Sequence, residues 1–257
     1  FYASRLGPGV DDLDLSLDDF ASKVNSDLVG KLVNIASRCA GFIARGSGGR
    51  LAGSLPEPEL QASFVAAAGS IAEAYEGRDL ARVVREVMQL ADRANLYIDQ
   101  QKPWLMAKDP ARAAEVQAVC TQGLNLFRIL ALYLKPVMPR LAAGAERFLG
   151  LGEQAWADAS RPLLGTAINP YEPLATRVDP AAAKALLAAL DGACPLCKGT
   201  GILSPAQRTH WEFFARDHQV QRTRPEPHRS FSFTNFPIGS PIRSASAADA
   251  AALIRAL

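Results

Sequence analysis

The sequence lacks any apolar run long enough to cross a membrane. Its most hydrophobic stretch, residues 124–134, is interrupted by Arg128 and falls short of the roughly 18 residues that a membrane-spanning helix needs. We therefore expect no membrane partner. The chain opens at Phe1 without an initiator methionine and without a basic and apolar leader, so we expect it to be a piece of a longer protein.

Cysteine is scarce, and neither sign of charge dominates. Four cysteines in 257 residues are too few for a disulfide scaffold, which favours the reducing cytoplasm. Lys and Arg total 28 against 26 Asp and Glu, so the net charge of +2 does not by itself indicate a polyanionic partner. With 49% hydrophobic and 21% charged residues, the sequence excludes wholesale disorder and indicates one large or two small globular domains.

The composition changes close to residue 191. Residues 192–257 carry 8 Lys and Arg against 4 Asp and Glu and contain all three histidines, whereas the longer first part is slightly acidic. Arg, Pro, Ser and Phe are frequent in this tail and follow no period. We expect a folded domain over residues 1–190 and a disordered or weakly folded tail over residues 191–257.

The spacing of apolar residues predicts helices throughout the first 190 residues. Apolar side chains three and four residues apart indicate a long helix from Asp18 to Phe42, closed by the glycine-rich run at 46–49. Further helices are expected at 58–75, 79–101, 110–134, 140–149 and 180–190, with an irregular segment at 151–176. No stretch alternates with period two. The predicted fold is all-α, an antiparallel helix bundle with an irregular C-terminal tail.

The first long helix carries a polar face beside its apolar stripe. At 100° per residue, the side chains of Lys31, Asn34, Arg38 and Arg45 share one sector of the helix. Asn34 and Arg38 are four residues apart, so their side chains are neighbours. An amide beside a guanidinium can hydrogen-bond a base edge and attract a phosphate, although an ordinary solvated helix face is the simpler interpretation.

A second candidate lies where the chain breaks between two predicted helices. Trp104 follows Pro103, whose ring fixes the backbone, and an indole held at such a turn can stack on an unpaired base. Stacking of this kind is worth about 1–3 kcal/mol per base. The alternative is a tryptophan whose ring is buried at the end of the bundle. Asp99 could pair with a neighbouring base or cap a helix.

Several residue strings in the first 190 positions recur in one protein family. They include DDLDL at 11–15, VNIASR at 33–38, VREVM at 84–88, PW at 103–104, NLFR at 125–128 and PLLG at 162–165. Through them the chain resembles the bacterial methionyl-tRNA synthetases over about residues 1–190. The matching part of that family is its C-terminal anticodon-binding domain, so the resemblance implies the helical fold of class I synthetase anticodon-binding domains.

The resemblance also implies a binding partner and a site. The partner would be tRNA(Met), read at its CAU anticodon. In the family the Asn and Arg of the first long helix contact anticodon bases, and the Trp after Pro stacks on the first of them. Carried over by position, the anticodon-binding residues are Asn34, Arg38, Asp99, Pro103, Trp104 and Arg177.

Catalytic motifs are missing from the chain. It contains no HIGH-like or KMSKS-like string and no phosphate-binding G-x-x-x-x-G-K-[ST] loop, so we expect no catalytic residues and no cofactor. The resemblance implies a parent enzyme that joins methionine to tRNA with ATP, and a catalytic domain elsewhere in the parent chain as a partner. Two alternatives stay open: the anticodon-binding domain of another class I synthetase, such as a cysteinyl or valyl enzyme, or a helical protein-interaction module.

The tail contains one motif that could bind a metal. Cys194 and Cys197 form a C-x-x-C-x-G-x-G string, half of a DnaJ-type zinc knuckle, which supplies two of the four ligands of a structural zinc. His210 and His218 are spaced too widely to complete a zinc finger. We therefore do not expect zinc in the tail.

Overall fold

The computed structural model describes residues 1–9 and 16–185 of the chain. Residues 1–9 and 18–177 belong to one compact unit, and the described residues of a second unit are 16–17 and 178–185. Residues 180–185 are helical, and the rest of the helix predicted to reach residue 190 lies outside the described residues. The tail predicted for 191–257, with Cys194 and Cys197, also lies outside them.

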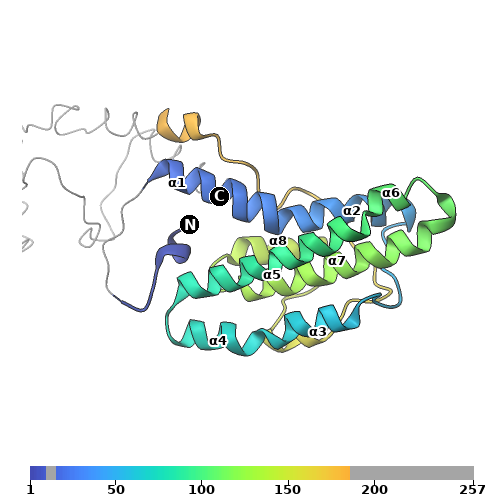
Figure 1. The fold of residues 1–257 in the computed structure, drawn as a ribbon, viewed down its shortest axis with the longest axis horizontal. Coiled ribbons are helices and arrows are strands. Elements are labelled where there is room, and N and C mark those ends of the chain that lie inside the picture. The colour runs from blue at the N-terminus through green and yellow to red at the C-terminus, as the bar shows by residue number, and fades with distance from the viewer. Residues whose placement is uncertain (10–15, 186–257) are drawn as a thin grey trace, which may run out of the picture. The chain divides into compact units, whose positions relative to one another are not determined.

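The first long helix is continuous, as the sequence predicts, but its middle has a different winding. It consists of α1 (Leu17–Lys23), the π-helix η2 (Val24–Val33) and α2 (Asn34–Gly46), which follow one another without a break (Figure 1). A Cβ atom added to Gly30 would lie 3.0 Å from the backbone oxygen of Asn25. Glycine at position 30 therefore allows this close approach within the wider π turn, a winding that is uncommon in proteins.

Several of the remaining helices begin at prolines, and one begins at a side-chain cap. They are α3 (Pro58–Ala66), α4 (Ala68–Glu76), α5 (Leu80–Gln101), α6 (Pro103–Met106), α7 (Ala113–Tyr133) and α8 (Pro139–Phe148), with 3-10 turns at Tyr2–Arg5 (η1), Pro110–Arg112 (η3) and Trp156–Ser160 (η4). Asp79 caps α5 by accepting a hydrogen bond of 2.9 Å from the backbone N–H of Arg82. The described residues contain no strand, which confirms the predicted all-α fold. None of the described helices is long and apolar enough to span a membrane.

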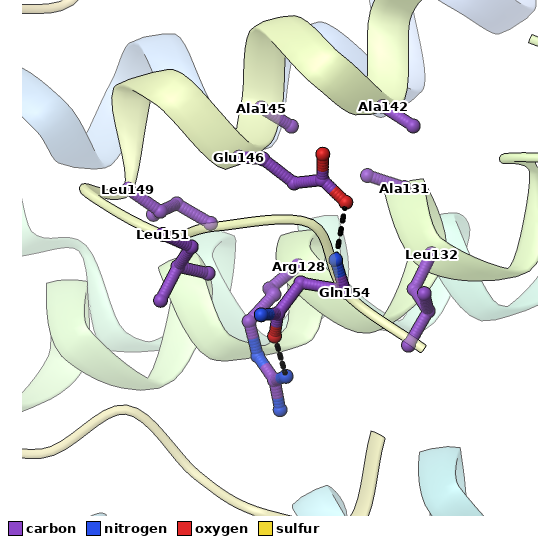
Figure 2. Close-up of a pocket in the computed structure, with 9 residues that line it drawn as sticks. All are labelled: Arg128, Ala131, Leu132, Ala142, Ala145, Glu146, Leu149, Leu151 and Gln154. Atoms are coloured by element: carbon purple, nitrogen blue, oxygen red, sulfur yellow. Dashed lines mark hydrogen bonds between the residues drawn. The ribbon is translucent and has the colours of Figure 1, made fainter. Parts of the chain in front are cut away.

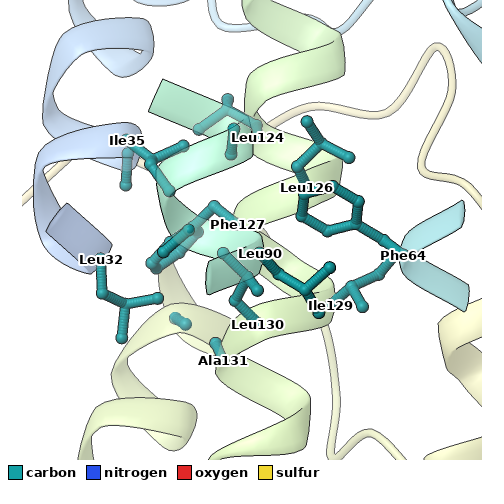
Figure 3. Packing of buried hydrophobic residues seen from close by; sticks show 14 of the residues in the cluster. Leu32, Ile35, Phe64, Leu90, Leu124, Leu126, Phe127, Ile129, Leu130 and Ala131 are labelled. Carbon is teal, nitrogen blue, oxygen red and sulfur yellow. The ribbon is translucent and has the colours of Figure 1, made fainter. Parts of the chain in front are cut away.

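Helix α7 occupies the centre of the bundle. Every residue from Val119 to Leu134 is buried, and the helix contacts α2, α3, α5 and α8. In Figure 3, Leu32 and Ile35 lie on one side of Phe127, and Phe64 of α3 lies beside Leu126 and Ile129. A helix that is covered on all sides needs an apolar surface all round, which explains the nearly continuous apolar run at 124–134.

Helices α2 and α7 approach closely because a glycine lies between them. A Cβ atom added to Gly123 would lie 2.7 Å from the sulfur of Cys39. Cys39 and Cys120 are free, buried thiols in this contact. A hydrogen bond with Cys120 and burial raise the pKa of the Cys39 thiol well above its ordinary value, so this thiol is unreactive near neutral pH.

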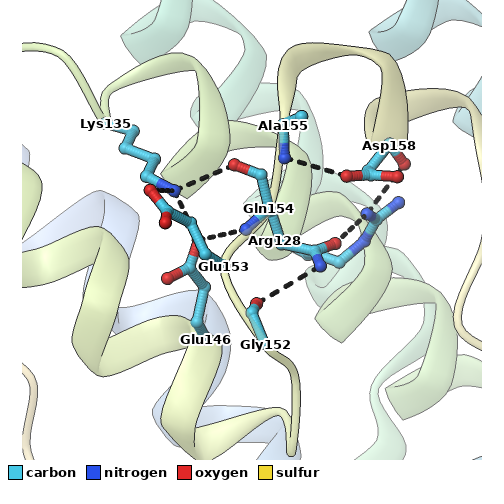
Figure 4. Close-up of polar contacts among 8 residues, drawn as sticks. All are labelled: Arg128, Lys135, Glu146, Gly152, Glu153, Gln154, Ala155 and Asp158. Atoms are coloured by element: carbon cyan, nitrogen blue, oxygen red, sulfur yellow. Dashed lines mark hydrogen bonds and ion pairs between the residues drawn. The ribbon is translucent and has the colours of Figure 1, made fainter.

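Buried polar side chains of α7 hold the irregular segment that follows α8. Arg128 is buried and donates hydrogen bonds to the backbone oxygens of Asp158 (2.9 Å) and Arg161 (2.5 Å). Burial lowers the pKa of its guanidinium. Lys135 contacts Glu146 at 3.0 Å in the same group of polar contacts (Figure 4). The packing around Arg128 leaves a cavity of only about 10 Å³ (Figure 2).

Trp156 of this segment packs on the bundle. Its ring lies 4.9 Å from that of Tyr133 and 6.2 Å from that of Tyr75, between ring centres. The segment is therefore irregular in backbone conformation but is fixed to α7 and α4 by aromatic packing as well as by the polar contacts.

Candidate nucleic-acid interface

Three polar pairs join η2 and α2 to α5. We call them the polar ladder: Lys31 with Asp92 (3.0 Å), Asn34 with Asn95 (3.3 Å), and Arg38 with Asp99 (2.5 Å). The two partners of each pair are 61 positions apart in the chain. Because both members advance by three and then four residues, the two helices run in the same direction and face each other along one stripe. Consecutive long helices of the bundle are thus antiparallel, whereas the helix formed by η2 and α2 runs parallel to α5.

Arg38 has two fixed partners at one end of the ladder. Its guanidinium pairs with the carboxylate of Asp99, and its central carbon lies 4.8 Å from the centre of the Trp104 ring. Charge pairing and the cation–π contact together orient a side chain that would otherwise be flexible. Asp99 was expected to pair with a base or to cap a helix. It pairs with Arg38 and keeps 56% of its side chain exposed. Its contact with a base stays a prediction.

Trp104 lies at the surface because of a turn between α5 and α6. Lys102 ends α5 in the left-handed region, with φ of 50°, and its N–H donates to the backbone oxygen of Ile98 at 2.9 Å. The buried Pro103 then begins α6. Trp104 is 38% exposed, so the interpretation of a ring buried at the end of the bundle is wrong. Arg38 covers one side of the ring, and the ring retains surface that a base can contact.

Asn34 and Lys31 face α5 beside Arg38, as their shared polar face predicts. The side-chain nitrogen of Asn34 donates to the side-chain oxygen of Asn95, and Lys31 forms an ion pair with Asp92. Asp92 and Asn95 were not predicted as site residues from the sequence. The matching spacing of polar residues at 31, 34, 38 and at 92, 95, 99 is the signal that could have indicated them.

Arg45 extends the same helix face toward the end of α2. It is exposed, and its guanidinium lies 5.8 Å from the ring centre of Phe42 and close to Gly41. Phe42 and Arg45 border a cleft of about 240 Å³ between the end of α2 and residues 107–117. The same helix thus carries the polar ladder and, toward its end, borders a partly apolar cleft.

Arg177 is not brought to this interface by any described contact. It is exposed, and among residues 1–9 and 16–185 it has no hydrogen bond or ion pair with the polar ladder or Trp104. Its role in RNA binding stays a prediction. Within the same described ranges no cluster of three or more His, Cys, Asp or Glu side chains could hold a metal ion.

Comparison with known proteins finds one family along most of the described chain. Residues 52–179 match the family described as the anticodon binding domain of methionyl tRNA ligase, and residues 1–40 match class I tRNA synthetases (M). The apo form of Mycobacterium tuberculosis methionyl-tRNA synthetase has a similar fold, with a TM-score of 0.58 and 24% identity over 64% of this chain and 35% of that chain. The complex of the Mycobacterium tuberculosis enzyme with methionyl-adenylate gives a TM-score of 0.54 and 24% identity, over 61% and 33%. The chain therefore spans about a third of the length of these structures.

Proposed function

We propose that this chain, which belongs to the methionyl-tRNA synthetase family through residues 1–40 and 52–179, recognises the CAU anticodon of tRNA(Met). The observation that carries the proposal is the exposed indole of Trp104 beside the oriented guanidinium of Arg38, at one end of the polar ladder. A partly exposed ring next to fixed hydrogen-bonding groups is how proteins commonly read unpaired bases of an RNA loop.

Trp104 would stack the first anticodon base. Arg38 lies against one side of the ring, so the base stacks on the part of the ring that faces solvent and places its edge toward the ladder. Pro103 supports this role by fixing the turn that exposes the ring. Because the ring and the guanidinium already contact each other, little side-chain freedom would be lost when the base binds.

The polar ladder favours recognition of base edges over general attraction of phosphates. Each cation of the ladder is paired with a carboxylate, Lys31 with Asp92 and Arg38 with Asp99. Paired charges attract a phosphate weakly, but their remaining donors and acceptors can still hydrogen-bond a base. Arg45, on the same helix and bordering the cleft, would contact the RNA backbone. We include Arg177 only through its position in the family.

The parent protein would be a methionine–tRNA ligase. We propose that it uses ATP to make methionyl-tRNA in the cytoplasm, with its catalytic domain in the parent chain as the partner of this domain. The present chain contributes tRNA binding and needs no cofactor for it. This part of the proposal rests on the family match and on the absence of catalytic motifs from the sequence.

The direct test is binding of the 257-residue chain to tRNA with a CAU anticodon and to the same tRNA with one anticodon base changed. We expect tighter binding to CAU, and weaker binding as salt is added because some phosphate contacts are lost. A preference for a cysteine or valine anticodon would replace the CAU proposal with another class I synthetase. Absence of salt-dependent tRNA binding would instead favour a protein-interaction module.

A further inference from the structure

The orientation of the Asn95 amide is determined by its neighbours. Its side-chain nitrogen donates to the backbone oxygen of Ala91 at 2.9 Å and to the backbone oxygen of Lys31, in η2, at 3.0 Å. Backbone carbonyl oxygens only accept hydrogen bonds, so the amide cannot be turned over without placing its own oxygen against both of them. The Asn95 nitrogen therefore faces the two carbonyls, and its oxygen faces the other way.

The fixed Asn95 amide in turn orients Asn34. The oxygen of Asn95 accepts a hydrogen bond from the side-chain nitrogen of Asn34 at 3.3 Å. A reversed Asn34 would place two oxygens against each other, which leaves an acceptor without a donor. The side-chain oxygen of Asn34 is thus turned away from Asn95, and among the described residues no group donates to it.

We infer that Asn95 is a positioning residue that makes Asn34 present its oxygen to the RNA, so that this position selects a base with an amino group. This inference rests on the proposed function. An outward acceptor matches the N4 amino group of cytosine, whereas uracil carries the O4 acceptor at the corresponding place. The geometry of the ladder therefore favours cytosine over uracil at the base that reaches Asn34. Asn95 acts through Asn34 and need not touch the RNA.

The test measures the affinity of the full chain for an anticodon stem-loop with cytosine at the first anticodon position, and for the same stem-loop with uracil there. In Asn95→Ala the Asn34 amide is free to turn over and can donate to uracil. We expect the preference for cytosine over uracil to fall by about tenfold, mainly because binding of the uracil form improves. A purely structural role would weaken both complexes equally and would overturn the inference.

Two further variants serve as controls for misfolding and for indirect effects of the substitution. Asn95→Asp keeps an acceptor toward Asn34, so it should retain most of the preference for cytosine even where the protein is less stable. Asn169→Ala removes a comparable amide-to-carbonyl hydrogen bond outside the ladder, between Asn169 and the backbone of Arg147 (2.6 Å), and should leave the preference unchanged. Loss of the preference in Asn169→Ala, or equal loss in Asn95→Asp and Asn95→Ala, would contradict the proposed role.

A double-mutant cycle separates this inference from the proposed function. In an Asn34→Ala background, Asn95→Ala should cause no further change in the preference, because the two residues act as one unit. An undiminished effect there would overturn the inference. If the unmodified chain binds neither stem-loop, the proposed function itself fails. If it binds both with a cytosine preference that Asn95→Ala leaves intact, only the inference fails.

Discussion

Trp104 is held at the surface by the two residues that precede it. We expect Trp104→Ala to weaken binding of a CAU anticodon stem-loop by about 1–3 kcal/mol, because the stacking surface is lost. The neighbouring Leu105 is 48% exposed and supplies a matched control, since Leu105→Ala removes apolar surface from the same short helix without removing a ring that contacts Arg38. A fluorescence titration measures both affinities. Equal, small effects of the two substitutions would exclude the stacking role.

Lys102 has a strained backbone conformation at that turn. Its φ of 50° lies in the left-handed region, where a side chain costs about 1–2 kcal/mol and where helix ends usually carry glycine. Lys102→Gly removes this cost but makes the unfolded chain more flexible, so we expect a net stabilisation of up to about 1 kcal/mol. Urea unfolding monitored by circular dichroism checks it. A clear loss of stability would mean that the lysine side chain contributes more to the turn than its backbone strain removes.

The contact between α2 and α7 depends on the absence of a side chain at position 123. Gly123→Ala would force a methyl group against the Cys39 sulfur, and we expect a loss of about 1–3 kcal/mol in the free energy of unfolding. Adding Cys39→Ala makes room for the methyl group, so the double variant should be more stable than the sum of the single effects predicts.

Gly69 provides a control, because its substitution should change the free energy of unfolding in the opposite direction. Gly69 lies in α4, and a Cβ atom added there meets nothing within 4 Å. Gly69→Ala should therefore raise the free energy of unfolding by about 0.5–1 kcal/mol through its helix propensity. Destabilisation by both substitutions to a similar extent would show that steric contact with Cys39 is not the cause at Gly123.

The limits of the long helices could be predicted from the sequence because apolar spacing and prolines act locally. The structure begins or ends the predicted helices within a few residues of the expected places, apart from a break at Ala67 and a 3-10 turn at 110–112. The π-helix was not predicted, because apolar residues three to four apart fit either winding. The polar ladder was only half predicted, since pairing of Asn34 with Asn95 depends on how two helices pack and not on spacing within either.

The burial of polar residues in α7 was a second feature that local sequence patterns did not predict. The sequence predicts an apolar stripe on this helix, but Thr121, Gln122, Asn125 and Arg128 are buried as well. They are tolerated because irregular segments before α3 and after α8 supply partners. Thr121 accepts from the backbone N–H of Ala52 at 2.8 Å, and Asn125 accepts from the backbone N–H of Leu163 at 2.7 Å. Such a segment has no periodicity, so its contacts could not be inferred from the chain alone.

At the scale of the whole molecule, we expect buried and half-buried tyrosines to make the fold sensitive to alkali. Burial raises the pKa of Tyr75 and of Tyr133 to about 12, from an ordinary value of about 10. Burial and nearby Glu57 also raise the pKa of Tyr97. Between the unfolded and the folded values the unfolded chain loses these protons first, so the stabilisation is complete below about pH 10 and is lost as the pH rises toward 12.

The expected result is a melting temperature that falls steadily from about pH 10 to pH 12, measured by circular dichroism. Tyr75→Phe removes one of the titrating groups together with its 2.7 Å hydrogen bond to the backbone oxygen of Tyr133. This variant should be less stable at pH 8 but should lose stability less steeply above pH 10. A melting temperature that stays constant across this range would contradict the role of the tyrosines.

The central position of α7 also has a consequence for synthesis on the ribosome. Helices α2, α3 and α5 all pack on α7, yet they are translated before it. At about 5–20 residues per second, the apolar face of α2 waits on the order of ten seconds before the central helix is complete. During this interval the nascent chain carries an unburied apolar surface, which is the kind of surface that chaperones cover. Completion of α7 is therefore the step at which the nascent chain can first form its core.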